Sequence, residues 1–316
     1  MEYSVLGKSG LYVSKLAFGS LTVGPLQANL PVDEGAEVIA YAFDRGVNFI
    51  DTAQYYENYA YLKKALKLTK RNDIVVSTKS YAYSRELAVE AVEQARRELD
   101  RDVIDLFMLH ETESYLTIRG HMDALEYYGE CKAKGIIKAV GVSTHHVAGV
   151  YGAIQHGIFD CIHPIFNIKG LGIADGTRDD MEKALLCAEK ENIGIFTMKS
   201  LGGGNLHTDA ESAFDFVMSK SFVNSVAVGM QSFEEVDANI GYFEGKGFTE
   251  DEKKALIQKK RLLHIEPWCE GCGKCIERCH QNALRLEDGK SVCDSSKCVL
   301  CGYCSGVCPV FAIKVF

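Results

Sequence analysis

Short apolar runs alternate with longer amphipathic segments from residue 1 to about residue 248. The runs are rich in β-branched residues and nearly continuous in apolar side chains, which is typical of parallel strands covered on both faces. A helix-like segment follows each run. The eight predicted strands are Lys15–Ser20, Asn48–Ala53, Asp73–Ser80, Val103–Glu111, Ile137–His146, Cys161–Ile168, Gly194–Ser200 and Val223–Met230.

The segment Ser84–Leu99 shows how the helix-like segments are recognised. Apolar residues recur there at the helical period, so that Leu87, Ala95 and Leu99 fall on one face. Ser84 is suited to cap the first turn with its hydroxyl. The segment therefore predicts one of the helices that cover the strands.

Eight strand–helix units over about 250 residues match a closed (β/α)8 barrel in number and length. The second interpretation is a doubly wound α/β sheet, which is expected to carry a G-x-G-x-x-G turn after its first strand. No such turn follows the first predicted strand. The pattern therefore predicts an α/β fold of the TIM-barrel type.

A last helix is predicted after the barrel. Thr249 and Glu252 form a capping-box pattern ahead of the segment Lys253–Leu263, and Pro267 then marks a boundary. The remaining chain to Phe316 is short and rich in cysteine. A segment of this size builds only a small core, so bound metal is expected to supply much of its folding free energy.

Eight of the twelve cysteines lie in two runs near the C-terminus, and both runs read Cys-x2-Cys-x2-Cys-x3-Cys. This is the spacing of bacterial two-cluster ferredoxins, in which the fourth cysteine of a run ligates the other cluster. The pattern predicts two [4Fe–4S] clusters in a small ferredoxin-like α+β domain. The expected ligands are Cys269, Cys272, Cys275 and Cys308 for one cluster, and Cys298, Cys301, Cys304 and Cys279 for the other.

Other uses of these cysteines fit the pattern less well. Zinc sites use separated pairs of cysteines, and a disulfide framework requires an oxidising compartment, whereas no secretory signal is visible at Met1. The predicted organisation is a barrel over residues 1–248, a linker helix over 249–266 and a ferredoxin-like domain over 267–316.

Two residues depart from the usual ferredoxin run. His280 stands where a proline normally follows the fourth cysteine, and Cys293 is an additional thiol five residues before the second run. Local packing explains both. The alternative is that His280 adjusts the potential of the cluster held by Cys279 through a hydrogen bond.

Composition narrows the classes of partner. The net charge of −8 and the lack of a basic stripe argue against nucleic acid. No apolar run approaches the about 18 residues that a membrane span requires. Oxygen-sensitive clusters and the lack of an export signal favour a cytoplasmic protein.

Candidate catalytic residues stand at the carboxyl ends of predicted strands two, three and four, where barrel enzymes place their active sites. They are Asp51, Lys79 and His110, and Tyr56 lies in the loop after Asp51. Each alone has an ordinary structural explanation, but the four together suit carbonyl reduction. Tyr56 would donate a proton, with its pKa lowered by the Lys79 ammonium. Asp51 would hold Lys79, and His110 would orient the substrate oxygen.

Four segments match motifs of one known family: Leu6–Gly19, Asp51–Tyr56, Val76–Lys79 and Asp105–His110. Through them, residues 1 to about 245 resemble the aldo-keto reductases. The resemblance implies a barrel whose floor is plugged by an N-terminal hairpin, and a tetrad of Asp51, Tyr56, Lys79 and His110. Tyr55 competes with Tyr56 for the role of acid, and the spacing of the family favours Tyr56.

The resemblance also implies NADPH or NADH, bound in an extended pose across the barrel mouth. Ser143 and Thr144 fall where the family holds the carboxamide, and the glycine run after predicted strand seven falls where it holds the pyrophosphate. The residues expected at the cofactor are Ser143, Thr144, His163, Met198, Lys199, Ser200, Leu201, Gly202, Gly203, Gly229, Met230, Gln231, Ser232, Glu235 and Asn239.

Three of these residues depart from the family. His163 replaces a glutamine, and Met198 stands where many members place an aromatic ring against nicotinamide. Glu235 replaces an arginine that grips the 2′-phosphate of NADPH. A carboxylate repels that phosphate, so we expect NADH as the nicotinamide cofactor.

Three functions are compatible with the two halves of the chain. The first is an enzyme that uses a nicotinamide cofactor to reduce a small carbonyl compound or, in the opposite direction, to oxidise an alcohol. The clusters of such an enzyme are structural or serve a partner protein. The second is a reductase in which ferredoxin or another electron-transfer protein feeds the clusters, and these pass single electrons to the substrate. The third is an electron carrier or redox sensor, which the intact tetrad disfavours. We expect the cluster domain to lie at or beside the barrel mouth.

Overall fold

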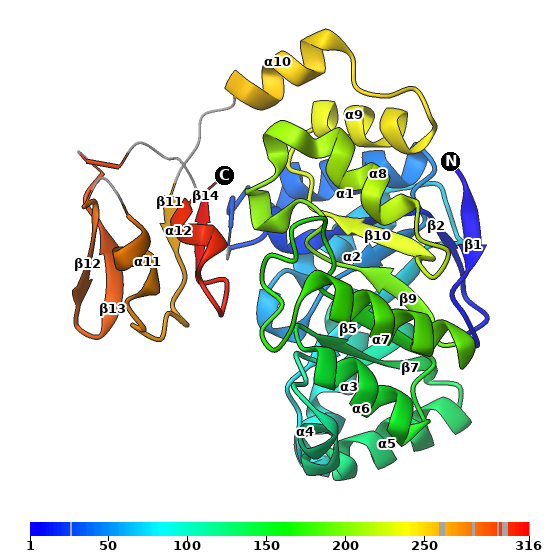
Figure 1. Ribbon diagram of the computed structural model, residues 1–316. Helices are drawn as coiled ribbons and strands as arrows, with labels where there is room; N and C mark the ends of the chain where they lie inside the picture. The colour runs from blue at the N-terminus through cyan, green and yellow to red at the C-terminus, as the bar shows by residue number, and fades with distance from the viewer. Residues whose placement is uncertain (26, 259–262, 280–281, 296, 299–302, 316) are drawn as a thin grey trace.

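The computed structural model describes residues 1–316 except 26, 259–262, 280–281, 296, 299–302 and 316 (Figure 1). The expected cluster ligand Cys301 and the residue His280 therefore lie outside the described residues. No helix in the described part of the chain combines the length and the apolar character that a membrane span requires.

A closed barrel of eight parallel strands forms the larger part of the molecule, as the sequence predicts (Figure 1). Each strand lies within the corresponding predicted segment, and the strands follow one another around the barrel in chain order. The strands are β3 (Leu16–Gly19), β4 (Phe49–Asp51), β5 (Val75–Ser80), β6 (Ile104–Leu109), β7 (Ile137–Thr144), β8 (Cys161–Pro164), β9 (Gly194–Thr197) and β10 (Ser225–Val228).

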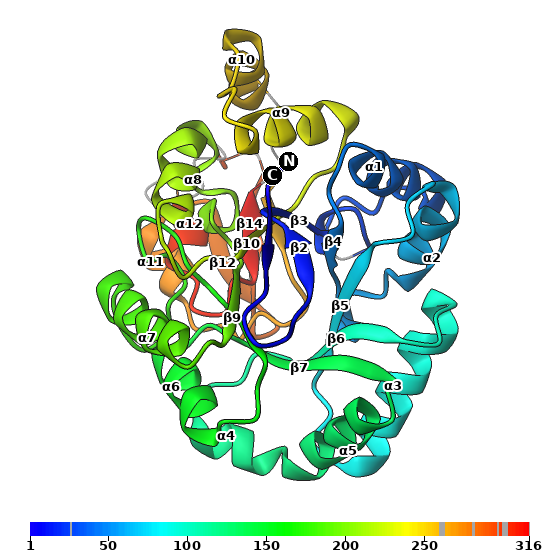
Figure 2. The same ribbon diagram turned by 90° about the vertical axis from the view of Figure 1, so that its right-hand side faces the viewer.

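Helices surround the barrel and cover its outer face (Figure 2). Their apolar faces bury against the strands and against one another, which explains why the strand sequences are apolar on both faces. The helices of this layer are α1 (Val32–Asp44), α2 (Tyr59–Leu68), α3 (Arg85–Leu99), α4 (Tyr115–Gly120), α5 (Met122–Ala133), α6 (Val147–His156), α7 (Arg178–Lys190), α8 (Ala210–Met218) and α9 (Phe233–Phe243).

Helix α3 confirms the predicted start of its segment. The Ser84 hydroxyl accepts a hydrogen bond from the backbone N–H of Leu87 at 3.4 Å. The buried face runs from Ala88 to Leu99, whereas the Leu87 side chain is 37% exposed. The prediction that Leu87 belongs to the buried face is therefore wrong, because the packed line begins one residue later.

The N-terminal hairpin closes one end of the barrel. Strands β1 (Tyr3–Val5) and β2 (Tyr12–Ser14) pair antiparallel, and Figure 2 shows them across the end that faces the viewer. Apolar residues of the hairpin join the barrel interior, as the resemblance implied. They are Leu6, Leu11 and Val13.

The C-terminal module begins earlier than the predicted boundary at residue 267. Helix α10 (Glu250–Gln258) starts with the expected capping box, in which Thr249 and Glu252 exchange hydrogen bonds. The predicted helix was extended to Leu263, but Leu263 starts strand β11 (Leu263–Ile265). Because β11 pairs with β14 (Ile313–Val315), it belongs to the module.

The module has the small α+β architecture predicted from its cysteines. A hairpin and two short helices accompany the β11–β14 pair, and cysteine side chains lie in their small apolar core. These elements are α11 (Lys274–Arg278), β12 (Leu284–Glu287), β13 (Lys290–Cys293) and α12 (Tyr303–Gly306).

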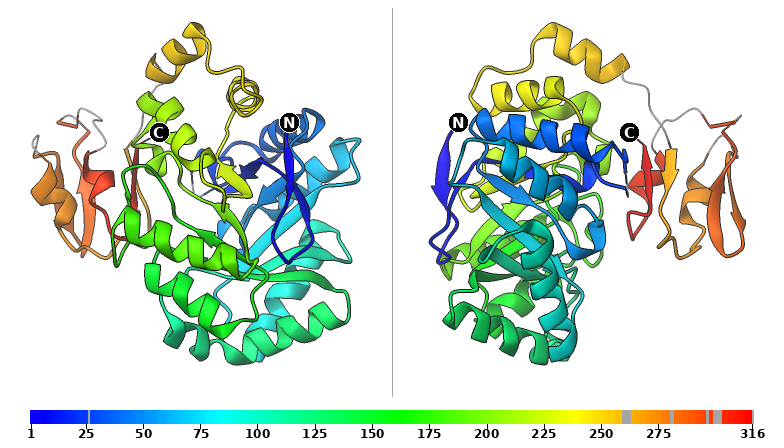
Figure 3. Two further views of the ribbon diagram at one scale, coloured as in Figure 1. Left: turned by 45° about the vertical axis from the view of Figure 1, so that its right-hand side comes forward. Right: turned by 180° about the vertical axis from the view of Figure 1, so that it is seen from behind.

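The module lies against the end of the barrel opposite the hairpin, as expected (Figures 1 and 3). The rings of Tyr55 and Trp268 meet edge to face, with centroids 5.6 Å apart. The Asn205 amide donates a hydrogen bond of 3.0 Å to the Ser305 hydroxyl. The carboxyl ends of the barrel strands therefore face the cluster module across a common interface.

Candidate active site at the barrel mouth

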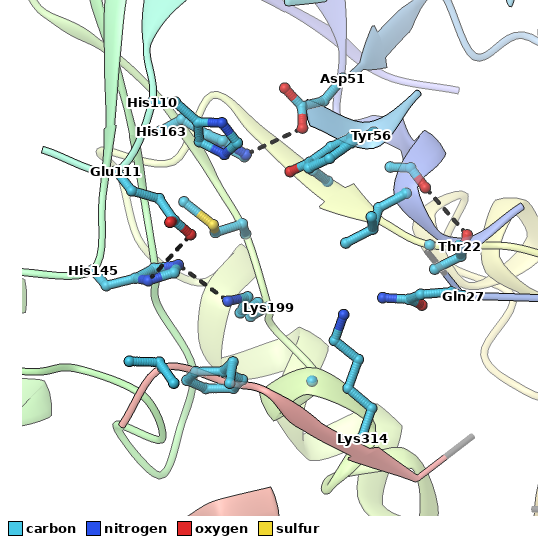
Figure 4. Close-up of a pocket in the computed structure, with 18 of the residues that line it drawn as sticks. Thr22, Gln27, Asp51, Tyr56, His110, Glu111, His145, His163, Lys199 and Lys314 are labelled. Carbon is cyan, nitrogen blue, oxygen red and sulfur yellow. Dashed lines mark hydrogen bonds and ion pairs between the residues drawn. The ribbon is translucent and has the colours of Figure 1, made fainter. Parts of the chain in front are cut away.

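A cavity of about 670 Å³ lies between the barrel mouth and the module (Figure 4). Asp51 and Lys79 reach it from the ends of β4 and β5, and His110 follows β6 directly. Tyr56 ends the short helix η2 (Gln54–Tyr56) in the loop after β4. The barrel thus brings the four predicted catalytic residues to one cavity.

Asp51 and Lys79 form a buried ion pair. The Lys79 ammonium donates to both carboxylate oxygens of Asp51, at 2.8 and 2.7 Å, and to the carbonyl of Thr52 at 2.9 Å. Burial opposes ionisation of Asp51, but Lys79 and His163 outweigh it and hold the pKa of Asp51 well below its usual value. The pair is therefore charged but close to neutral overall.

Tyr56 lies between this ion pair and His110. The Lys79 ammonium is 4.8 Å from the centroid of the Tyr56 ring, and the ring centroids of Tyr56 and His110 are 5.8 Å apart. Burial lowers the pKa of His110 to about 3, so its ring is neutral at pH 7. The His110 Nδ1 atom is buried without a hydrogen-bond partner among the described residues.

The expected acidification of Tyr56 is wrong for this structure. Burial and the negative charge of Asp51 raise the pKa of Tyr56 well above its usual value. The reason is that the Asp51 carboxylate neutralises the Lys79 ammonium, so the pair presents little net positive charge to the phenol. Tyr56 is consequently a protonated phenol at every physiological pH.

The neighbouring Tyr55 occupies a different environment. Its side chain is 43% exposed and packs edge to face against Tyr81 as well as against Trp268 of the module. It lines the cavity but takes part in the contact between module and barrel. The geometry therefore favours Tyr56 over Tyr55 as the residue beside Lys79 and His110.

A second series of interacting polar side chains lines the cavity, and the sequence analysis did not predict most of its members. The Tyr81 hydroxyl donates to Glu111 at 2.6 Å, and the Glu111 carboxylate lies 3.7 Å from His145 Nδ1. The Lys199 ammonium is 3.1 Å from His145 Nε2. Glu111 lies two residues after the end of β6 and His145 one residue after the end of β7, so the strand-end rule extended into the first loop residues would have found them.

Lys314 enters the same cavity from the module. It lies on β14, and its ammonium donates to Glu266 at 2.5 Å. Figure 4 shows its side chain directed into the cavity, on the side where Lys199 and Gln27 lie. No local signal in the sequence could have placed Lys314 there, because its position depends on how the module docks.

Four of the expected cluster ligands surround one small cavity in the module. Their backbone setting also suits thiolates, since the N–H groups of Ser291 and Ala312 point at Cys269 and Cys308 sulfur at 3.4 and 3.2 Å. The residues fit the first cluster, including the ligand that crosses over from the second run. They are Cys269, Cys272, Cys275 and Cys308.

Of the cysteines expected at the second cluster, the structure describes Cys279, Cys298 and Cys304. Cys279 and Cys298 both lie close enough to Cys293 to raise the pKa of its thiol, although burial is the larger cause. Among the described residues no three His, Cys, Asp or Glu side chains converge on a single ion. A cubane instead takes its thiolates at the corners of a tetrahedron, so this spread is compatible with a cluster.

The family follows from comparison with known proteins. A model described as the aldo/keto reductase family matches residues 15–215, which is more than half of the chain. The chain belongs to the aldo/keto reductase family. A second model, described as a 4Fe-4S dicluster domain, matches residues 268–312. This aldo/keto reductase thus carries an iron–sulfur module, and its family implies NAD(P)H as cofactor in general.

Curated relatives of this aldo/keto reductase match it over parts of their length. Probable aldo-keto reductase 1 of Glycine max is 30% identical over 214 residues, which is 63% of this chain and 59% of that protein. A probable voltage-gated potassium channel subunit beta of Arabidopsis thaliana is 33% identical over 142 residues, or 40% of this chain and 42% of that protein. The chain spans about half the length of these two relatives.

Solved structures of aldo-keto reductases share the fold. A putative aldo-keto reductase from Pseudomonas aeruginosa has a TM-score of 0.67 and 24% identity, covering 77% of this chain and 94% of that one. The holo form of an aldo-keto reductase from Bacillus halodurans has a TM-score of 0.67 and 21% identity, covering 82% and 96%. At this identity the likeness shows the fold alone.

The residues expected at the nicotinamide cofactor of this aldo/keto reductase divide into two groups. One group lines the cavity: His163, Met198, Lys199, Ser200, Leu201, Gly203, Gly229 and Gln231. The other group lies outside it: Ser143, Thr144, Gly202, Met230, Ser232, Glu235 and Asn239. The structure therefore brings together the loop after β9 and the end of β10, but not the whole predicted set.

Residues of the second group are occupied elsewhere. The Ser143 and Thr144 hydroxyls are fully buried and donate to the backbone carbonyls of Leu109 and Thr112, so neither is free to hold a carboxamide. The Glu235 carboxylate accepts a hydrogen bond from the backbone N–H of Gln231 at 2.8 Å. Glu235 thus holds the loop before α9 and does not line the cavity.

The loop after β9 is suited to bind the phosphates of a dinucleotide, whereas the end of β7 is not suited to bind the nicotinamide carboxamide. Ser200 presents a buried hydroxyl without a partner among the described residues. Gly203 adopts a φ of +68°, which glycine tolerates because it has no Cβ. The phosphate side of a dinucleotide therefore has suitable residues here, whereas the expected carboxamide contacts are absent from the described cavity wall.

Proposed function

We propose that this aldo/keto reductase reduces the carbonyl group of a small molecule, or oxidises the corresponding alcohol, with Tyr56 as proton donor and acceptor. The supporting observation is the meeting of the Tyr56 phenol, the unpaired His110 ring and the Lys79–Asp51 pair at one cavity. The substrate oxygen would accept hydrogen bonds from Tyr56 and from neutral His110. Both groups would fix its position for reaction.

Proton transfer follows from the pKa values of the two oxygens. When carbon gains two electrons and a hydrogen, the carbonyl oxygen becomes an alkoxide, which is a far stronger base than a phenolate. Tyr56 can therefore give up its proton even though its pKa is raised. The phenolate that remains would take up a proton from solvent, so that Tyr56 is ready for the next turnover.

The family supplies the first candidate for the electron source. A bound nicotinamide would supply a hydride to the carbonyl carbon, and Ser200 and the glycines after β9 would hold its phosphates. We propose NADH, because Glu235 stands where a cation would be needed for the 2′-phosphate of NADPH. A strong preference for NADPH in turnover would contradict this assignment.

One observation favours a second candidate, in which electrons arrive from the clusters. Trp268 and Glu270 flank the ligand Cys269, Val310 and Phe311 follow Cys308 closely, and all four line the active-site cavity. We propose two [4Fe–4S] clusters, the nearer held by Cys269, Cys272, Cys275 and Cys308. Such clusters supply electrons one at a time, and reduced ferredoxin is the kind of partner that would feed them.

Turnover of the anaerobic holoprotein tests the proposed function. A panel of aldehydes and ketones is offered with NADH, with NADPH and with reduced ferredoxin, and alcohol formation is measured. We expect alcohol with at least one donor. Intact clusters but no alcohol from any carbonyl with any donor would overturn the proposal.

The origin of the hydrogen on carbon separates the two electron sources. In D₂O with unlabelled NADH, hydride transfer leaves protium on the carbinol carbon of the product. Electrons delivered singly require carbon to take a hydrogen from exchangeable acid, so deuterium would appear there. Mass spectrometry of the alcohol reads the difference directly.

A further inference from the structure

Lys199 is a cavity-facing cation that the proposed chemistry does not use. It follows Met198 in the loop after β9 and adopts a left-handed backbone with a φ of +57°, which is uncommon for a residue other than glycine. Strained positions of this kind cluster at functional sites. An ammonium held at such a position is suited to binding a ligand.

The described protein groups form no direct ion pair with Lys199, and the Glu111 carboxylate offsets its charge only from a distance. Its ammonium contacts His145 Nε2 and lies 4.0 Å from the centroid of the Phe311 ring. Burial and the positive charge of Lys199 hold the pKa of His145 well below its usual value, so that partner is neutral. No carboxylate among the described residues is paired with Lys199, since Glu111 contacts Tyr81 and His145 instead.

Lys314 adds a second positive charge to the same cavity. Each lysine lies in the electrostatic field of the other, and the Lys314 charge helps to lower the pKa of Lys199. Lys314 is paired with Glu266, which is itself buried, so it is partly neutralised. Two ammonium groups in a cavity of low dielectric repel, and an anion placed between them relieves that cost.

We propose that Lys199, assisted by Lys314, binds a carboxylate of the substrate, so that the preferred substrates are keto acids or the matching hydroxy acids. The inference rests on the proposed carbonyl chemistry and names the substrate class for it. The carbonyl would lie at Tyr56 and His110, and the carboxylate at the two lysines across the same cavity. Because one lysine comes from each domain, the site is complete only when the module is docked.

A dinucleotide phosphate is the competing anion for Lys199. Phe311 of the module packs against the loop after β9, with ring atoms 3.1 Å from the position of a Cβ at Gly203, so a phosphate held by this loop lies beside that ring. The Lys199 ammonium lies over that same ring and beside His145. A phosphate bound by Lys199 in place of the carboxylate would show as a raised KM for NADH in Lys199→Met.

Equilibrium binding to the anaerobic holoprotein, without an electron donor, tests the carboxylate site. The probes are pyruvate and levulinate, which differ in the distance between carbonyl and carboxylate, and the uncharged ketone butanone. We expect at least one keto acid to bind more tightly than butanone in calorimetry. In Lys199→Met that keto acid should bind roughly ten- to hundredfold more weakly, while butanone binding is unchanged.

Matched variants identify the cause of any loss. Lys199→Arg keeps the charge and should retain most of the affinity, and Lys314→Met should weaken keto-acid binding less than Lys199→Met does. Lys190→Met removes an exposed lysine at the end of α7 and should change nothing. Equal losses in Lys199→Met and Lys190→Met would show a nonspecific charge effect and overturn the proposal.

The remaining outcomes separate this inference from the proposed function. If neither keto acid binds more tightly than butanone, or if Lys199→Met raises the KM for NADH and leaves keto-acid binding intact, the carboxylate site is wrong while ketone reduction can still proceed. If keto acids bind through Lys199 but no carbonyl is reduced with any donor, the site stands and the proposed function fails.

Discussion

At the residue scale, the chemistry of the site depends on how each charge is paired. The strand-end rule located Asp51, Lys79 and His110 because barrel geometry fixes where strand ends meet. It could not give the pKa of Tyr56, which depends on whether Lys79 faces the phenol alone or together with Asp51. The sign of that shift decides how activity depends on pH.

The raised pKa of Tyr56 predicts different pH profiles for the two directions of the reaction. For reduction of butanone, which has no carboxylate, kcat should stay flat from about pH 6 to about pH 9, because the phenol is protonated throughout. Oxidation of butan-2-ol needs the phenolate and should speed up as pH rises over that range. A fall in ketone reduction between about pH 7 and pH 8 would indicate a lowered Tyr56 pKa instead.

Keto-acid binding should follow a separate titration. Burial lowers the pKa of Lys199 to about 8, with Glu111 opposing the shift and Lys314 reinforcing it. The ammonium is fully present below that value and is lost above it. The Kd of the keto acid should therefore rise above about pH 8, whereas the Kd of butanone should not. The Lys199 ammonium is also influenced by Lys79, His145 and Cys308. The control is therefore Lys199→Arg, which stays charged over the whole pH range.

The buried ion pair makes Lys79 important for stability as well as for chemistry. Lys79→Met removes the main counter-charge of the buried Asp51 carboxylate and leaves only His163 and the Ser77 hydroxyl beside it. The free energy of unfolding should therefore fall by about 3–5 kcal/mol in denaturant titrations. The loss should shrink as pH falls, because Asp51 can then take up a proton. Lys67→Met is the control, since Lys67 pairs with Asp100 at 2.9 Å while the two side chains are 63% and 55% exposed, and it should cost about 1 kcal/mol or less. Equal costs would contradict the paired, buried state of Asp51.

At the element scale, short segments fix the module on the barrel. Glycines in the loops after β8 and β9 leave room for the Phe311 ring, since a Cβ at Gly172 would lie 1.6 Å from that ring. The sequence predicted all eight barrel strands, because their apolar runs are continuous. It misplaced the end of the α10 helix, because the pairing of β11 with β14 joins segments about 50 residues apart and leaves no local signal.

Gly172→Ala tests this contact. Its φ of +84° and the clash with Phe311 should together displace the module, shifting the emission of Trp268, the only tryptophan of the chain, to longer wavelength. Gly157→Ala is the control, because Gly157 has a φ of +79° but no atom within 4 Å of an added Cβ. It should cost about 1 kcal/mol without moving the Trp268 emission. Identical spectra for the two variants would argue against Phe311 as the anchor.

At the scale of the whole molecule, a large barrel and a small module depend on different sources of stability. The module has a small apolar core that includes Cys275, Cys304 and Cys308, so its clusters are expected to supply much of its folding free energy. Cysteine spacing predicted this domain from sequence, because ligand geometry is local. For the shared cavity, the sequence predicted only that the module lies at the barrel mouth. The residues that line the cavity from the module could not be predicted, since the cavity is formed by both domains.

Iron content and iron removal test the cluster assignment. The anaerobic protein should hold about eight irons per chain. Cys308→Ser should lower this to about four, while Cys293→Ser should leave it unchanged. Chelation should unfold the module and shift the Trp268 emission while the barrel helices persist in circular dichroism. Cys293→Ser with the same iron loss as Cys308→Ser would contradict the ligand set.

The most direct test of the central claim compares Tyr56→Phe with Tyr55→Phe. Among the described residues the Tyr56 hydroxyl has no protein hydrogen bond, so its removal should leave the fold intact. With the best carbonyl substrate and electron donor, Tyr56→Phe should lower kcat by about 10²–10⁴-fold, whereas Tyr55→Phe should stay within about threefold of wild type. A folded Tyr56→Phe variant with wild-type kcat would contradict the role of Tyr56 as the proton donor.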